Sequence, residues 1–272
     1  MKYRHIILTR FNLQFDLQSD IHLQKEWLSE RMRLFTRYCL PSLQQQSNHH
    51  FTWVLLVSDQ TPKDVQQTLL NYAEKFSYIE IHFCAYTNNL NALYKEIGMR
   101  YVQGYDYLLS TRMDNDDMLA NNFCEALQNA ILSAPTERII YTFPNGTQWF
   151  ETQNLIYGVR YSKNHFLSFF EPASDIKTCL GFDHTQVPAQ QTIELEGKAM
   201  WCEIVHNTNI CNNYNPTFRY RLLLNDLSYP IMWENCNREW LSKCLFLIKE
   251  YGRYRYAQCQ RLLKKLFRNH IF

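Results

Sequence analysis

Strand-like and helix-like segments alternate about four times along residues 1–143, and this alternation constrains the fold more than any other feature. Short apolar runs without a helical period predict buried strands at 4–10, 51–57, 78–85, 105–110 and 138–143. Amphipathic segments predict helices at 25–39, 62–76, 91–102 and 119–132. Pro41 is expected to end the first helix. The alternation is typical of a mostly parallel sheet with helices on both faces, where ligands bind beyond the carboxyl ends of the strands.

The pattern changes after residue 143. Residues 144–235 contain Pro, Asn and Gly turns and short aromatic runs, which predict antiparallel strands and long loops on an acceptor side. Residues 238–268 are helical by composition. The 272 residues are 46% hydrophobic, enough for a large core. We therefore expect one α/β domain over 1–235, divided near residue 143, and a helical extension over 236–272.

Several common sites are excluded by composition. Gly is scarce, at 7 residues, and neither of the two usual Gly-rich phosphate-binding motifs occurs. The 9 Cys include no C-x-x-C pair, which argues against a zinc ribbon and favours reduced core thiols in a cytoplasmic protein. Neither a signal peptide nor an apolar run of roughly 20 residues is recognisable.

Three carboxylates lie close together after the predicted strand 105–110. They are Asp114, Asp116 and Asp117. Neighbouring carboxylates raise one another's pKa unless a cation compensates their charge. Mg²⁺ or Mn²⁺ prefers oxygen ligands and often shares them with substrate phosphates, where it neutralises charge on a leaving group. The cluster therefore predicts a divalent metal ion beside a diphosphate.

Other interpretations of this cluster remain. The loop could be merely polar, with Asp117 capping the next helix. An EF-hand is excluded, because its sixth and twelfth positions require Gly and Glu and Leu119 occupies the sixth. A phosphatase with Asp114 as nucleophile would also place two Asp after a strand, but such enzymes carry them near the N-terminus. A non-catalytic nucleotide- or carbohydrate-binding protein is a further alternative.

The sequence Ser110-Thr-Arg-Met-Asp-Asn-Asp-Asp117 resembles the most specific motif of the bacterial rhamnosyltransferase family, a GT-A-type glycosyltransferase family. Further matching pieces lie in segments 5–12, 27–46, 51–59 and 171–209. The chain departs from the family at Asn207, where relatives often have Gly. The resemblance implies a GT-A-type fold and inverting transfer of a sugar, rhamnose by the family's label, from a dTDP- or UDP-linked donor. The implied acceptor is a glycan or lipid-linked glycan, and the implied cofactor is Mn²⁺ or Mg²⁺.

The resemblance also implies roles for individual residues. Asp116 is expected to contact the metal directly, and Asp114 to reach the donor, or the metal through water. His206 is the expected third metal ligand, with His184 as runner-up.

Three further residues are expected at the donor. Arg112 suits a diphosphate or sugar, and equally an ion pair with its acidic neighbours. Asp59 could bind the base or ribose, or cap a turn. Arg10 could contact the nucleotide, or be a surface residue.

An inverting transfer requires a base that takes the proton of the acceptor hydroxyl. Candidates on the acceptor side are Glu171, Asp183 and Asp175, with Glu171 preferred because of its Glu-Pro context.

The C-terminal segment is strongly basic. Residues 238–272 carry a net charge of +7 and the remainder −5. The segment could be a solvated helix, or could lie on the anionic inner membrane through Leu241, Leu245, Phe246 and Ile248. Nucleic-acid binding is not expected, because no nucleic-acid module accompanies it.

Overall fold

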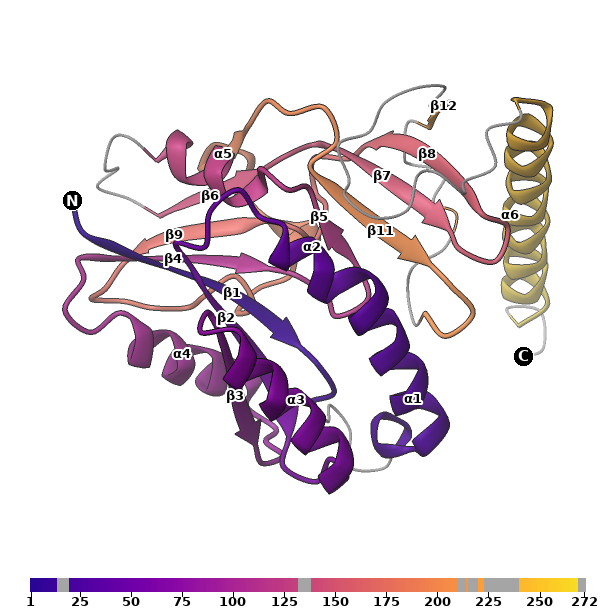
Figure 1. The fold of residues 1–272 in the computed structure, drawn as a ribbon. Coiled ribbons are helices and arrows are strands. Elements are labelled where there is room, and N and C mark those ends of the chain that lie inside the picture. Colours follow the sequence, from indigo (N-terminus) through magenta and orange to yellow (C-terminus); the bar gives the residue numbers. More distant parts are fainter. Residues whose placement is uncertain (14–19, 132–137, 210–213, 215–219, 223–239, 269–272) are drawn as a thin grey trace.

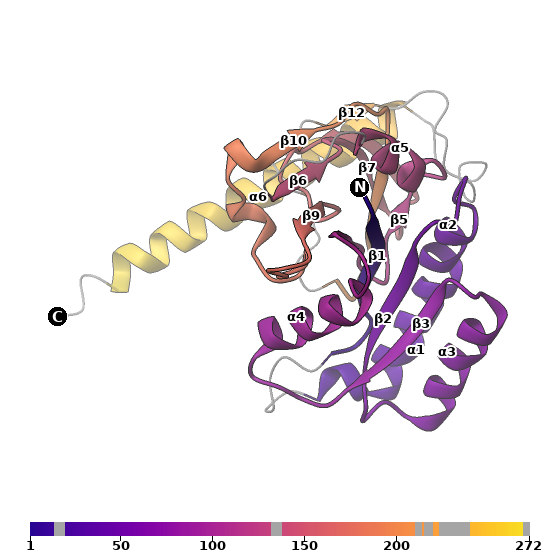
Figure 2. The same ribbon diagram turned by 90° about the vertical axis from the view of Figure 1, so that its left-hand side faces the viewer.

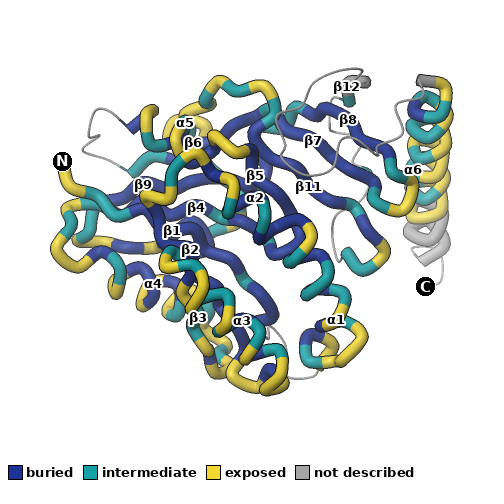
Figure 3. The backbone as a smooth tube through the Cα atoms, in the orientation of Figure 1, coloured by how far each residue is buried: buried dark blue, intermediate teal, exposed yellow. Residues whose placement is uncertain are grey.

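A seven-stranded sheet, in the order β10-β6-β9-β4-β1-β2-β3, forms the body of the protein (Figure 1). The computed structural model describes residues 1–13, 20–131, 138–209, 214, 220–222 and 240–268, the last helix with side chains to 261. Its parallel strands are β1 (Tyr3–Arg10), β2 (Thr52–Ser58), β3 (Ile79–Cys84) and β4 (Tyr107–Arg112). Figure 3 shows that β1, β2 and β4 are largely buried, as is typical of strands covered on both faces, whereas the edge strand β3 is partly exposed. The predicted mostly parallel sheet is confirmed.

Helices cover both faces of this sheet. One face, with Ile7, Trp53 and Leu109, packs against four helices: α1 (Lys25–Leu34), α2 (Leu40–Gln44), α3 (Lys63–Lys75) and α5 (Phe123–Ala130). The other face, with Ile6 and Leu108, packs against α4 (Leu90–Tyr101). Figure 2 shows α4 on the opposite side of the sheet from α1 and α3. Gly104, with φ of 78°, makes the turn from α4 into β4.

The expected end of the first helix at Pro41 is wrong. A π-helical turn over Phe35–Cys39 joins α1 to α2, and Pro41 lies in the first turn of α2. Proline is tolerated there because a first-turn N–H has no partner within its own helix. The π turn shifts the helix register, and Cys39 Sγ contacts the carbonyl oxygen of Asp114 at 3.7 Å.

The second half extends the first sheet and builds another. Strands β6 (Ile139–Thr142), β9 (Ser168–Pro172) and β10 (Thr192–Glu194) join the first sheet, where β9 runs antiparallel to β4 and β6. The second sheet has the order β12-β8-β7-β11-β5. Its strands are β5 (Met118–Leu119), β7 (Asn145–Phe150), β8 (Leu155–Arg160), β11 (Trp201–Val205) and β12 (Arg221–Leu222). The expected antiparallel pairing holds for β7 with β8, whereas β11 pairs with β7 in parallel.

The C-terminal helix α6 (Trp240–Arg268) confirms the predicted extension, and it projects from the body (Figure 2). Phe246, which was expected to face lipid, instead packs on Phe150 and Tyr157 of the second sheet. Leu241, Leu245 and Ile248 are exposed. Among the described helices, none combines the length and apolarity needed to cross a membrane. The expected boundary at 235 lies outside the described residues.

Candidate active site at the switch point of the sheet

Two arginines and an aspartate meet where the strand order of the first sheet reverses. Strands β1, β2 and β3 follow one another to one side, and β4 lies on the other side of β1. Arg10 ends β1, Arg112 ends β4, and Asp114 follows β4 directly. Ligands of open α/β sheets bind at such a reversal. The sequence motif therefore occupies the position where the fold provides a binding crevice.

Asp114 is held by the two arginines. Arg112 donates from Nη2 and Nε to its two carboxylate oxygens at 3.0 and 3.3 Å, and Arg10 Nη2 lies 3.9 Å away. Burial alone would raise the pKa of Asp114, but Arg112, His165 and Arg10 keep it well below its usual range. Of the two predicted roles of Arg112, the structure shows the ion pair. A contact from Arg112 or Arg10 to the donor stays a prediction.

Asp117 belongs to the site and does not cap a helix, contrary to the alternative weighed for it. Helix α5 begins six residues later at Phe123, after the short strand β5. The Asp117 carboxylate is fully buried, accepts a hydrogen bond from the Ile204 backbone N–H at 2.9 Å, and lies 2.8 Å from His165 Nε2. Burial, then the charges of Asp116 and Asp114, raise the pKa of Asp117 well above its usual value. A cation here would compensate this charge.

His165 was not predicted, because a single histidine in a loop carries no sequence signal. A stack of rings positions it. The Trp201 ring lies over Gly146, Phe166 stacks on Trp201 with centroids 5.0 Å apart, and His165 stacks on Phe166 at 4.1 Å. A Cβ at position 146 would come within 2.1 Å of the Trp201 ring, so the stack requires glycine there.

Asp114, Asp117 and His165 fit a divalent metal ion. One ligand atom from each lies within 4.8 Å of the others, and burial with like charges leaves Asp117 in need of a counter-charge. Two carboxylates and an imidazole suit Mn²⁺, and the carboxylates also suit Mg²⁺. This set shares Asp114 with the predicted ligands, but it contains Asp117 and His165 in place of Asp116 and His206.

Asp116 and His206 meet beside this cluster. His206 Nε2 lies 2.9 Å from Asp116 Oδ2, as expected for two ligands of one ion. The same oxygen accepts a hydrogen bond from Arg31, a buried residue of α1 that was not among the predicted site residues. The Thr208 N–H donates to His206 Nδ1, and the Asn209 side-chain amide nitrogen lies 2.9 Å from His206 Nε2. In this arrangement Arg31 supplies the positive charge beside Asp116.

Of the remaining predicted residues, only His184 contacts a residue of the site described above. His184 Nδ1 is 3.4 Å from Arg112 Nη1. Asp59 is exposed at the carboxyl end of β2 and accepts a hydrogen bond from Gln60. Asp183 is exposed and caps the 3-10 turn that begins at His184, and exposed Asp175 pairs with Arg138. Neither aspartate is placed to take a proton at the cluster.

The structure does not bring Glu171 to the site. Glu171 pairs with Leu108 in the β4–β9 register, four residues from Arg112 and so about 13 Å along the strand. It is fully buried, and its two oxygens accept hydrogen bonds from the backbone N–H groups of Lys177 and Thr178, each at 2.8 Å. Glu171 holds a turn at the far end of β9.

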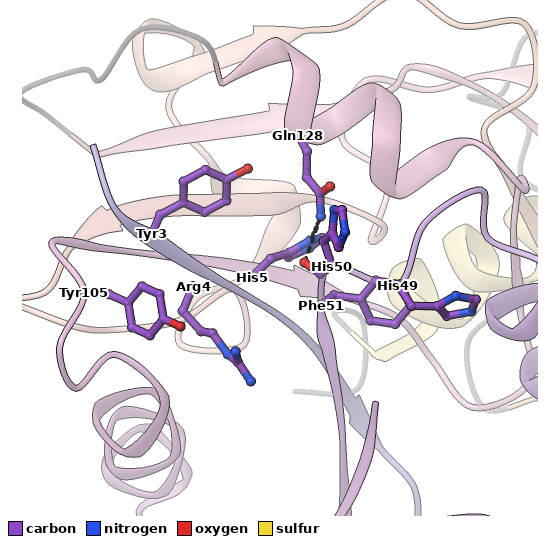
Figure 4. A pocket seen from close by; sticks show the side chains of 8 residues that line it. All are labelled: Tyr3, Arg4, His5, His49, His50, Phe51, Tyr105 and Gln128. Carbon is purple, nitrogen blue, oxygen red and sulfur yellow. Dashed lines mark hydrogen bonds between the residues drawn. The ribbon is translucent and has the colours of Figure 1, made fainter. Parts of the chain in front are cut away.

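A pocket of about 350 Å³ lies at the opposite edge of the sheet (Figure 4). Tyr3, His5, Phe51 and Tyr105 line it near the amino ends of their strands. His5 is buried and bonded through both ring nitrogens, to Thr111 Oγ1 at 3.0 Å and Gln128 Nε2 at 2.9 Å. Five residues of β1, about 16 Å, separate His5 from Arg10. The pocket is therefore distinct from the aspartate site.

The comparison with models of protein families agrees with the motif. The model of the family described as "Putative rhamnosyl transferase" matches residues 12–217. S. aureus TarS 1-349, solved in complex with UDP, is similar over 75% of this chain and 61% of that chain, with 12% identity and a TM-score of 0.41. The structure of mouse xyloside xylosyltransferase 1 in its apo form matches over 56% of this chain and 54% of that chain, with 9% identity and a TM-score of 0.28. No curated protein matches the chain.

This chain thus spans less than two thirds of the length of those solved structures. The family model, in contrast, covers most of the chain and includes the whole 110–117 motif, Asp117 and His165 among its residues. The chain belongs to the family of rhamnosyl transferases.

Proposed function

We propose that this protein is a metal-dependent glycosyltransferase that moves a sugar, rhamnose by the family's name, from a dTDP- or UDP-linked donor to a glycan or lipid-linked glycan with inversion. The observation that carries the proposal is the cluster of Asp114, Asp117 and His165 at the switch point of the sheet. Two further potential ligands, Asp116 and His206, lie directly beside it. Mn²⁺ or Mg²⁺ is the proposed cofactor.

The chain's own residues suit a diphosphate leaving group. A metal held by Asp114, Asp117 and His165 would supply positive charge to the departing diphosphate. Arg112 and Arg10 lie at the same carboxylate and can pair with phosphate oxygens once a donor enters. Asp59, at the end of the neighbouring strand, is proposed to meet the base or ribose. The two arginines then position the donor and compensate the charge that develops on it.

The exposed side of α6 supports a peripheral membrane contact. Leu241, Leu245 and Ile248 follow each other at helical spacing and point away from the second sheet, while Lys249 and Arg253 lie on the same helix. Apolar residues flanked by basic ones favour an anionic membrane surface. This placement would bring the site near a lipid-linked acceptor.

A nucleotide-binding panel tests the proposal. dTDP, UDP, GDP and CMP are titrated calorimetrically with Mn²⁺ present and with EDTA. We expect dTDP or UDP to bind with Mn²⁺ and at least tenfold more weakly without it, and Asp114→Asn to abolish the metal effect. Release of the diphosphate from the matching nucleotide sugar then separates a transferase from a binding protein, which would bind the donor without consuming it. Absence of nucleotide binding under all conditions would refute the proposal.

A further inference from the structure

A buried glutamate on β11 lies next to the aspartate cluster. Glu203 precedes Ile204, whose backbone N–H donates to Asp117, and it is only 6% exposed. Side chains alternate along a strand, so Glu203 lies on the same face of β11 as Trp201. That face carries the stack of Phe166 and His165 on Trp201. Glu203 therefore shares the side of the sheet from which His165 reaches the cluster.

Hydrogen bonds hold one oxygen of this carboxylate. Gln148 Nε2 donates to Glu203 Oε2 at 3.2 Å, and Gln148 Oε1 in turn accepts from Tyr220 OH at 2.5 Å. Within the described part of the chain, Glu203 Oε1 receives no hydrogen bond. A carboxylate fixed through one oxygen, with the other unbonded, is arranged to accept a proton from a ligand.

Before a metal ion binds, the surroundings of Glu203 bring its pKa close to neutral. Burial raises its pKa to about 7; the charge of His165 opposes this rise, and the charges of Asp117 and Asp116 add to it. General bases work best when their pKa lies near the working pH.

We propose that Glu203 is the general base of the transfer. This inference rests on the proposed function. In the step, a lone pair of the acceptor hydroxyl oxygen forms the new bond to the anomeric carbon of the sugar. The bond from that carbon to the diphosphate oxygen breaks, and its electron pair leaves with the diphosphate. The hydroxyl proton passes to Glu203 Oε1.

Glu171 provides the matched comparison. It is also a buried glutamate whose pKa burial raises to about 7. Both of its oxygens accept backbone hydrogen bonds, and it lies at the far end of β9. The two glutamates therefore share burial and charge, and differ in position and in the availability of an oxygen.

The test compares Glu203→Gln with Glu171→Gln. The readouts are Mn²⁺-dependent binding of dTDP, thermal unfolding, and release of dTDP from dTDP-rhamnose with water as the acceptor. We expect Glu203→Gln to lower the release rate by about 10²–10⁴-fold while dTDP affinity changes less than twofold. Glu171→Gln is expected to keep the wild-type rate per folded molecule. In Glu203→Ala, added formate should restore part of the rate, which a merely structural role would not allow.

The outcomes separate the two proposals. A Glu203→Gln protein that releases dTDP within a fewfold of the wild-type rate overturns the role of Glu203 and leaves the proposed function intact. Loss of dTDP binding in that variant likewise overturns it, because a base for the acceptor is not needed to hold the donor. A wild-type protein that neither binds dTDP nor consumes the donor overturns the proposed function itself, and the base with it.

Discussion

Asp117 Oδ2 and His165 Nε2 lie 2.8 Å apart in the interior, although 48 residues separate them in the chain. Burial raises the pKa of Asp117 most, and the nearby charges of Asp116 and Asp114 raise it further. A buried carboxylate beside like charges is costly until a cation arrives. The pair therefore makes metal binding and stability interdependent.

Asp117→Asn should separate these two effects. Without metal, the variant is expected to be as stable as the wild type or more stable, because a like charge is removed. At Mn²⁺ about 100-fold above its dissociation constant, the wild type should gain about 2.7 kcal/mol. Thermal unfolding with and without Mn²⁺ measures both. A variant that keeps the full Mn²⁺ stabilisation would show that Asp117 is no ligand.

Gly146→Ala should disturb the ring stack that positions His165. The new methyl group would lie 2.1 Å from the Trp201 ring, and such overpacking costs about 1–3 kcal/mol. The affinity for the metal ion should fall as well, because the stack positions His165. Gly252→Ala is the control, because Gly252 lies in α6 with open space around it and alanine favours a helix by about 1 kcal/mol. Chemical denaturation of both variants checks this. If Gly146→Ala were as stable as Gly252→Ala, the close packing of Trp201 on Gly146 would be contradicted.

The raised pKa of Glu171 predicts that the free energy of unfolding falls as the pH rises. Burial raises its pKa from an ordinary 4.5 to about 7, so the folded state keeps a proton that the unfolded state releases. Between these values the unfolded state binds fewer protons, and the free energy of unfolding decreases with pH, by about 3 kcal/mol in total from this group. Glu171→Gln should remove that part of the slope. Urea denaturation from pH 4 to pH 8 measures it, and parallel curves for wild type and variant would disprove it.

Leu245→Glu should weaken binding to membranes. Leu245 is 57% exposed on α6. Burying a leucine side chain in an apolar environment is worth about 1.5–3 kcal/mol, so replacing Leu245 should lower the membrane affinity roughly 10–100-fold. Gln260→Glu adds the same charge at another exposed position of α6 without removing an apolar group, and should have a smaller effect. Flotation with vesicles of anionic and zwitterionic lipid provides the measurement. Wild-type protein that does not float with anionic vesicles would exclude the membrane contact of α6.

Local patterns predicted the parallel half of the fold because each strand there is a short apolar run and each helix has an apolar face. The π turn at Phe35–Cys39 and the two-residue strand β5 have no such period, and both were missed. At the site, Asp114 and Asp116 were visible because they follow a strand within one motif. His165 and Glu203 reach the cluster only through the packing of Trp201 and the pairing of β11 with β7. Contacts between distant segments leave no local signal, which is also why Glu171 was preferred as the base and Glu203 was not among the candidates.

The most direct test is anomalous diffraction at the manganese edge from crystals grown with dTDP and Mn²⁺. The account predicts one strong peak between Asp114, Asp117 and His165, at about 2.0–2.3 Å from their ligand atoms, with the diphosphate on its open side. Bound dTDP with no peak among these three side chains would contradict it.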